Sequence, residues 1–403
     1  MKSFNMPAPV NFWRWISPNT IAIVTGQAVF HWSIEGNSDP VKVFDRNAAL
    51  GDNTQIINYQ VSRDDKWCLL CGISAGNAPG IINGNMQLFS VEKSVSQMLT
   101  GHSGVFTVVQ VPGRAEPAQV LCFEKKEEGQ APKLYVMEVR GNKDVAGGVF
   151  RPAAQVIPMA PDAPNDFPVT MNASSKHALV YLITKMGYVF VFDIISCKAV
   201  HRARITQDTV IVSTINTESE GVLAVTRRGQ MIHVCVNETG LVPAVVARDQ
   251  ELAIALAGRL NLPGADDIFK SQFSAKVQAG DIAGAAAVAG SSPRGFLRTA
   301  ETIELFKRMT PQPGQSAPLF QYFNVLLEKG SLNQLESVEL AKPVIESGRV
   351  QLLEKYVAED KLELTEVSLT LKPYISLYWW CLVSRRVPYS TALIFFHHIL
   401  SHH

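Results

Sequence analysis

The stretch NFWRWISPNTIAIVTGQAVFHWSIEG, residues 11–36, decides the fold of the first half of the chain. It holds three apolar runs, at 12–17, 21–25 and 28–34, separated by short polar breaks. Runs of β-branched and aromatic residues bounded by turn residues predict β-strands. Strands this apolar need neighbours on both faces and along both edges, so the stretch predicts one part of a larger array of sheets.

Similar units recur further along the chain. Each reads as a strand, a short polar turn and a second strand, as in AVFHWSIEGNSDPVKVFD (28–45) and YVFVFDIISCKAVHRARI (188–205). The units begin near residues 28, 86, 134, 188 and 231, an interval of about 40 to 60 residues, which is the size of one four-stranded propeller blade. Propellers close with roughly four to eight blades. The repetition therefore favours a β-propeller over a large sandwich.

The apolar period changes at about residue 249. Segments such as PLFQYFNVLLEKG (318–330) carry apolar residues at helical spacing, are about 10 to 17 residues long and end at Gly or at a turn with Pro. Asp281 is a predicted N-cap, and Gly280 and Gly330 are predicted C-caps. Short helices joined by tight turns predict an α-solenoid, in which each pair buries its faces on the next.

Charge and targeting signals narrow the function classes. The 37 Lys and Arg nearly balance the 36 Asp and Glu, so there is no global field to attract nucleic acid or an anionic membrane. The N-terminus has no apolar core of a signal peptide, which predicts a cytoplasmic protein with reduced cysteines. The aromatic segment 368–403 has no apolar arm of the roughly 20 residues that a membrane span needs.

The sequence shows no catalytic constellation and predicts no cofactor or metal. The CLLC motif at 68–71 has the form of a metal or redox site, but it lies inside an apolar run that reads as a buried strand. His102 in TGHSG is similar to the structural Gly-His of WD-type blades, and the histidines at 397, 398, 402 and 403 are not expected to bind metal in the cell. A non-enzymatic binding module is favoured, because grooves between blades bind extended peptides.

A series of motifs in order resembles the clathrin heavy chain family, over about residues 10 to 366. They are FWRWIS (12–17), FHWSIEG (30–36), PVKVFDR (40–46), QIINY (55–59), GNMQLFSVEKSVSQ (84–97), NDFPV (165–169), LITKMGY (182–188), PGQSAPLFQYF (313–323) and LLEKYVAEDKLE (352–363). The resemblance implies a seven-bladed terminal-domain propeller whose first blade is missing here, followed by a linker and the start of a zigzag leg of short helices.

The resemblance also implies the boundaries of these parts. They are a partial propeller over 1–245, a helical linker over 246–310, the start of the leg over 311–366 and a tail over 367–403 that departs from the family. Two alternatives stay open. One is another coat or tethering scaffold that combines a propeller with a solenoid, and the less favoured one is a propeller enzyme.

The family binds adaptor peptides in grooves between blades, and the resemblance places three such sites on this chain. The groove for arrestin-type motifs, between the fourth and fifth blades in the family's count, matches Trp67, Leu88, Lys93, Val95 and Gln97. The W-box pocket matches Gln55, Ile57 and Ile73, and Lys2 matches the edge of the clathrin-box groove. Apolar pockets from Trp67, Leu88 and Val95, a hydrogen-bonding Gln97 and a cationic Lys93 suit an acidic peptide motif.

The implied role is structural, in the coat of coated pits and vesicles during endocytosis and intracellular transport. Its expected partners are adaptor and accessory proteins with clathrin-box or arrestin-type motifs. Clathrin light chain binding and trimerisation are expected only of the full-length family member. Nucleic acid is not an expected partner, and contact with a membrane is expected to be indirect, through adaptors at the cytoplasmic face of the plasma membrane and trans-Golgi network.

Overall fold

The computed structural model describes residues 3–363, except 52, 113, 115, 128, 140–149, 151 and 312–315, and except the side chain of residue 350. The chain divides into two compact units, Met1–Asn237 and Glu238–His403. Lys2, the tail 367–403 and its four histidines lie outside the described residues.

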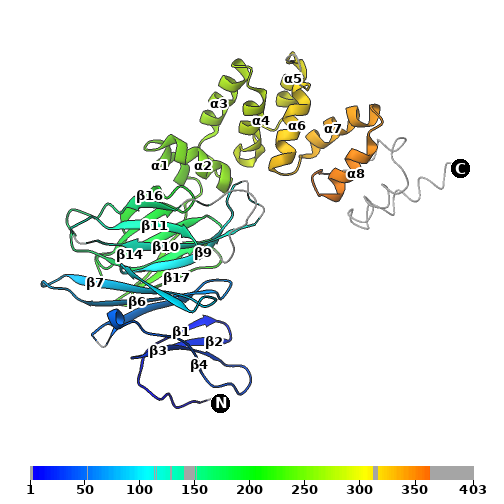
Figure 1. Ribbon diagram of the computed structural model, residues 1–403. Coiled ribbons are helices and arrows are strands. Elements are labelled where there is room, and N and C mark those ends of the chain that lie inside the picture. The colour runs from blue at the N-terminus through cyan, green and yellow to red at the C-terminus, as the bar shows by residue number, and fades with distance from the viewer. Residues whose placement is uncertain are drawn as a thin grey trace. The chain divides into compact units, whose positions relative to one another are not determined.

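The first unit consists of antiparallel sheets that follow one another along the chain (Figure 1). Their strands are β1 (Val10–Ser17), β2 (Thr20–Thr25), β3 (Ala28–Ser33), β4 (Val41–Asp45), β5 (Gln55–Val61), β6 (Trp67–Ala75), β7 (Ile82–Ser90), β8 (Val95–Thr100), β9 (Gly104–Val109), β10 (Ala118–Lys125), β11 (Lys133–Glu138), β12 (Ala153–Val156), β13 (Pro168–Ser174), β14 (Leu179–Thr184), β15 (Tyr188–Asp193), β16 (Ala199–Arg204), β17 (Val210–Ile215), β18 (Val222–Thr226) and β19 (Met231–Val234). The strands predicted at 12–17, 21–25 and 28–34 are confirmed as β1, β2 and β3.

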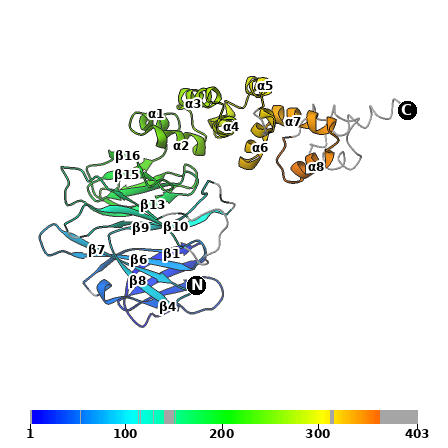
Figure 2. The same ribbon diagram turned by 45° about the horizontal axis from the view of Figure 1, so that its top comes forward.

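The sheets are propeller blades. In the described residues β1–β4, β5–β8, β9–β12 and β13–β16 form four-stranded sheets and β17–β19 a three-stranded one, each with its strands in chain order. The first strands of successive sheets, β1, β5, β9, β13 and β17, are neighbours, as strands around a common axis are. Figure 2 shows the sheets of this unit from a second side. A seven-bladed ring without its first blade would leave six blades, whereas the described residues form five sheets.

The core of this unit lies between the sheets. On β6, Cys68 and Leu70 belong to a cluster shared with the first sheet, and Leu69 and Cys71 belong to a cluster shared with the third. A third cluster joins the third and fourth sheets through residues such as Val120 and Phe192. Alternate residues of one strand thus face two different neighbours, which explains why these strands are apolar at almost every position.

The connection between the second and third sheets is fixed by Gly101 and His102. A Cβ at Gly101 would lie 1.9 Å from the carbonyl oxygen of Glu124, so only glycine fits there. The backbone N–H of His102 donates to the Glu124 carboxylate at 2.7 Å, and its ring nitrogens lie 3.2 Å from that carboxylate and 2.9 Å from the carbonyl oxygen of Ile82. The prediction that His102 is a structural hydrogen-bonding residue is confirmed.

The second unit consists of short helices packed in series. They are α1 (Leu241–Val246), α2 (Gln250–Leu260), α3 (Asp266–Gln278), α4 (Ile282–Gly290), α5 (Ala300–Arg308), α6 (Pro318–Lys329), α7 (Gln334–Glu346) and α8 (Val350–Ala358). Asp281 caps α4 by accepting from the Gly284 N–H at 2.8 Å, as predicted. Gly280 follows α3 with a left-handed φ of 70°, and Gly330 is the C-cap of α6.

A buried ionic network holds α6 and α7 to the segment before α5. The carboxylate of Glu336, fully buried, accepts from the guanidinium of Arg298, from the Tyr322 hydroxyl at 2.7 Å and from the Asn333 N–H at 2.9 Å. Asn333 completes a capping box by accepting from the Glu336 N–H at 3.0 Å. The buried charge is therefore paired and hydrogen-bonded on every side.

We expect Glu336→Ala to lower the free energy of unfolding of the helical unit by about 3 kcal/mol, because removing one partner of a buried pair leaves the other charge uncompensated. Urea unfolding followed by circular dichroism at 222 nm measures the change. Glu304→Ala is the matched control, since Glu304 forms an exposed ion pair with Lys307 and should matter little. Equal destabilisation by both variants would contradict the network's role.

Candidate functional site

The residues predicted for the arrestin-type groove gather at one end of the second sheet. In the strand register Trp67 lies opposite Ser90 and Ser90 opposite Val95, while Leu88 lies opposite Gln97. Directly opposite residues of an antiparallel pair share a face, so Trp67, Leu88, Val95 and Gln97 lie on one face. Lys93 lies in the turn between β7 and β8, two residues before Val95.

That face is turned towards the third sheet, which covers only part of it. Leu88 is 4% exposed and packs in the cluster with Leu121 and Phe123 of β10, and Trp67 is partly buried against the same cluster. Val95, in contrast, is 59% exposed. The outer strand β8 therefore forms an open rim beside a buried apolar floor.

The polar groups of this rim are available to a ligand. Gln97 and Lys93 are both exposed, and no described residue forms a hydrogen bond with the Gln97 carboxamide or an ion pair with the Lys93 ammonium. The nearby ammonium of Lys66 is engaged by the Glu92 carboxylate at 2.5 Å. The rim thus presents one carboxamide and one unpaired cation next to apolar surface.

The residues matched to the W-box pocket lie at the other end of the same face. Gln55 lies opposite Ile73, and the partly buried Ile57 packs against the cluster between the second and third sheets. Trp67 and Ile73 are six residues apart on β6, or about 20 Å. The two predicted sites are therefore separate, and Lys2 lies outside the described residues.

The structure adds a facing wall that the sequence prediction did not name. Phe106 of β9 and Tyr135 and Met137 of β11 are partly buried against the cluster that holds Leu88 and Trp67. The alternation in KLYVMEV signalled that Tyr135 and Met137 share a face, since Leu134 and Val136 face the fourth sheet instead. The sequence of one strand does not indicate which neighbouring sheet Tyr135 and Met137 face.

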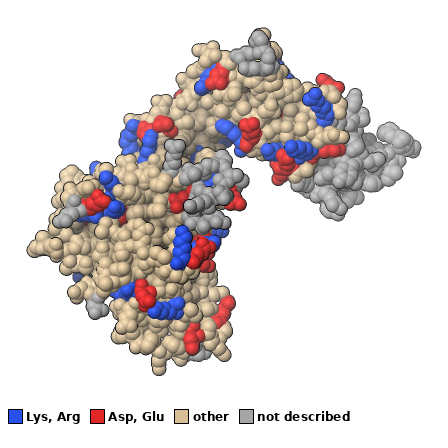
Figure 3. All heavy atoms as spheres, viewed as in Figure 1, with Lys and Arg blue, Asp and Glu red and all other residues tan. Residues whose placement is uncertain are grey.

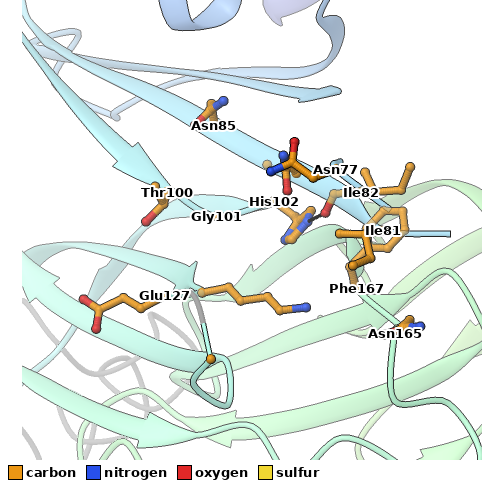
Figure 4. Close-up of a pocket in the computed structure, with 14 residues that line it drawn as sticks. Asn77, Ile81, Ile82, Asn85, Thr100, Gly101, His102, Glu127, Asn165 and Phe167 are labelled. Carbon is orange, nitrogen blue, oxygen red and sulfur yellow. Dashed lines mark hydrogen bonds between the residues drawn. The ribbon is translucent and has the colours of Figure 1, made fainter. Parts of the chain in front are cut away.

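A pocket of about 480 Å³ opens where the second, third and fourth sheets end, opposite to the Trp67 end (Figure 4). It is lined by the β6–β7 loop and the start of β7, the end of β8, the β10–β11 loop and the residues before β13. Figure 4 shows Asn77, Ile81, His102 and Phe167 gathered at one side of the pocket, and Thr100 and Glu127 towards the other side. None of Gln55, Ile57 and Ile73 lines it.

The charged surface is mixed. On the face drawn in Figure 3, the described Lys and Arg side chains alternate with Asp and Glu over both units, and no large area carries one sign. This arrangement follows the near balance of 37 basic and 36 acidic residues. On this face, charge therefore offers a ligand single local groups and no extended field of one sign.

The CLLC motif does not form a site. Cys68 and Cys71 are buried on β6, and because their spacing is odd they lie on opposite faces, in different core clusters. The prediction of a buried strand is confirmed. Among the described residues no group of three His, Cys, Asp or Glu could hold a metal ion. Within the same part of the chain no helix is long and apolar enough to cross a membrane.

Comparison with known proteins shows which family this chain resembles over most of its length. The human protein named clathrin heavy chain 2 is 42% identical over 368 residues, which is 91% of this chain and 22% of that protein. The chain is a homologue of the N-terminal region of clathrin heavy chains. The clathrin heavy chains of Dictyostelium discoideum and Drosophila melanogaster are 40% and 41% identical, each over 91% of this chain. The chain spans about a fifth of the length of these clathrin relatives.

The clathrin resemblance extends into the helical unit. A family model described as Clathrin-H-link matches residues 261–326, from the end of α2 into α6.

Two solved structures are similar to part of this chain. The match to Kluyveromyces lactis Hsv2 covers 59% of this chain and 66% of the Hsv2 chain, with a TM-score of 0.38 and 12% identity. The β-propeller domain of Myceliophteria thermophila Cps50 (Swd1) covers 58% and 66% with a TM-score of 0.37 and 11% identity.

The strand burial predicts which thiols react in the folded clathrin homologue. Burial raises the pKa of Cys68 to about 11 and that of Cys71 to about 12, so both remain protonated and shielded at pH 8. Cys235 is exposed. We expect Cys235→Ser to remove one fast thiol from a titration with Ellman's reagent, while Cys68→Ser leaves the count unchanged until denaturant is added. Fast labelling of Cys68 in the folded chain would contradict its burial.

Proposed function

We propose that this chain is a structural component of the clathrin coat and captures adaptor peptides between its second and third sheets. The groove is formed by Trp67, Leu88, Lys93, Val95 and Gln97. The helical unit then acts as the linker and first segment of the lattice-forming leg.

One observation carries the proposal. Val95 and Gln97 are exposed on a strand whose neighbours on the same face, Leu88 and Trp67, form an apolar floor. An extended peptide laid along β8 would bury apolar side chains on Val95 and Trp67 and hydrogen-bond the Gln97 carboxamide through its backbone. The unpaired Lys93 at the rim favours an acidic residue next to the apolar ones.

The rest of the proposed role rests on the resemblance to clathrin heavy chains. Adaptor and accessory proteins with arrestin-type motifs are the proposed partners, and Gln55, Ile57 and Ile73 form a second peptide position on the same face. The proposed location is the cytoplasmic face of coated pits and vesicles at the plasma membrane and trans-Golgi network, where the chain meets the membrane through adaptors. The proposed role is non-catalytic and requires no cofactor.

We expect an arrestin-type peptide to bind the full chain, and Gln97→Ala to weaken it about fivefold, the effect of losing one hydrogen bond of ordinary strength. Fluorescence anisotropy with a labelled peptide measures the affinity. Gln230→Ala is the matched control, since Gln230 is an exposed glutamine in the β18–β19 turn, away from the groove. Binding of a clathrin-box peptide but not of the arrestin-type peptide would overturn the assignment of this groove.

Lys93 offers a second test of the same groove. Lys93→Glu should abolish selectivity for acidic motifs, whereas Lys93→Arg should keep or improve it, because guanidinium can pair with a carboxylate through two hydrogen bonds. Anisotropy with the arrestin-type peptide and with a version that has Asn and Gln in place of its acidic residues gives the selectivity ratio. An unchanged ratio in Lys93→Glu would place the acidic contact elsewhere.

A further inference from the structure

We propose that the 480 Å³ pocket at the junction of the second, third and fourth sheets binds an extended acidic peptide segment. The site goes beyond the proposed function, because it shares no residue with the groove of Trp67 and Gln97 or with the position of Gln55, Ile57 and Ile73. It lies at the opposite end of the second sheet from Trp67, since Asn85 and Thr100 pair across β7 and β8 at this end.

The lining supplies groups that match a peptide backbone. The side-chain amides of Asn77, Asn83 and Asn165 line the pocket and have no hydrogen-bond partner among the described residues. Each carboxamide offers one acceptor and two donors, the complement of the C=O and N–H of an extended strand. Three such groups, from the ends of the second sheet and from the start of the fourth, border the same space.

The lining also supplies an apolar contact. Ile81 lines the pocket and is 40% exposed. The buried Phe167 ring forms a wall of the pocket, and its centre lies 5.0 Å from the centre of the His102 ring. Because His102 is itself fixed to Glu124 and to the Ile82 carbonyl, this wall is rigid. The pocket is therefore preformed for one apolar side chain of a bound segment.

The charges of the site favour an acidic occupant. Lys126 lines the pocket and forms no ion pair with any described residue, and the exposed Lys185 ammonium lies 5.5 Å from the centre of the Phe167 ring. The carboxylate of Glu127, in contrast, is engaged by Lys125 at 2.6 Å. Asp166 accepts from the Phe167 and Met186 N–H groups at 2.9 and 3.0 Å. Lys126 is thus the unpaired cation that lines the pocket, while the Glu127 carboxylate is paired. Asp166 does not line the pocket; its Oδ1 is held by backbone N–H groups and its buried Oδ2 has no partner among the described residues.

A peptide fits this set better than a phosphate group does. Phosphate sites gather several cations or backbone N–H groups around one point, whereas one ammonium lines this pocket. The rest of its polar lining is neutral amides, the Thr100 hydroxyl, the His102 ring and the paired Glu127 carboxylate, which would repel a phosphate. Neutral amides are instead suited to the neutral backbone between acidic side chains. The pocket thus has one place for an apolar side chain and one for a carboxylate.

The test is fluorescence anisotropy of the full 403-residue chain with a fluorescein-labelled peptide Gly-Ser-Asp-Asp-Leu-Asp-Asp-Ser-Gly at fixed ionic strength. We expect Lys126→Glu to weaken binding at least about tenfold and Ile81→Ser and Asn165→Ala by about threefold to fivefold each. Lys176→Glu, the same charge change at an exposed lysine of the β13–β14 turn that does not line the pocket, should leave this affinity unchanged. Thermal melting followed by circular dichroism establishes that each variant is folded.

Four outcomes would overturn the proposal. They are equal affinity in wild type and Lys126→Glu, equal binding of a peptide with Lys in place of Asp, displacement by inorganic phosphate at matched ionic strength, and no binding at millimolar peptide. The arrestin-type peptide, measured on the same variants, separates the two sites. If the pocket proposal is wrong, Gln97→Ala should still weaken binding of the arrestin-type peptide. If the groove proposal is wrong, Lys126→Glu should still weaken binding of the acidic peptide.

Discussion

Burial of both faces of a sheet between its neighbours is the constraint on which the first unit depends. On β6 the even positions 68 and 70 pack towards the first sheet and the odd positions 69 and 71 towards the third. A shift of register by one residue would exchange the two sets and leave both interfaces mispacked. The exposed rim exists because this constraint relaxes at β8, the outer strand, where burial gives way to exposed Val95 and Gln97.

The sequence predicted the strands, the helices and the repeat because these depend on local periods. The runs at 12–17, 21–25 and 28–34, the cap at Asp281 and the strand character of CLLC needed only neighbouring residues. The five repeated units seen in the sequence agree with the five sheets that the described residues form. The residues of the groove were named by resemblance, and the strand register shows that four of them share a face.

The features that the sequence did not predict join distant segments. Arg298 and Glu336 are 38 residues apart, and the pocket lining runs from Asn77 to Phe167. Asn, Lys and Ile are ordinary loop residues by themselves, and nothing local marks which of them meet. Leu88 illustrates the same limit, because a residue matched to a peptide groove also has to fill the core beneath it. Long-range packing decides both outcomes.

Each unit contains a fully buried carboxylate that is bound by its neighbours. In the first unit Glu124 accepts from the His102 N–H, and in the helical unit Glu336 organises Arg298, Tyr322 and Asn333 around itself. A satisfied network of this kind fixes the relative setting of the segments that contribute to it, because any other arrangement leaves a buried charge unpaired. An apolar interface tolerates small shifts more readily.

The Gly101–His102 connection has a consequence for how the first unit opens. His102 contacts Glu124 of β10 and the Ile82 carbonyl of β7, so neither strand can separate while the other keeps its hydrogen bonds. The second and third sheets are thereby expected to behave as one cooperative foldon, whose amide protons exchange through a shared opening. The two sheets that form the proposed groove would then fold and unfold together, so a partly unfolded chain would not present one wall of the groove without the other.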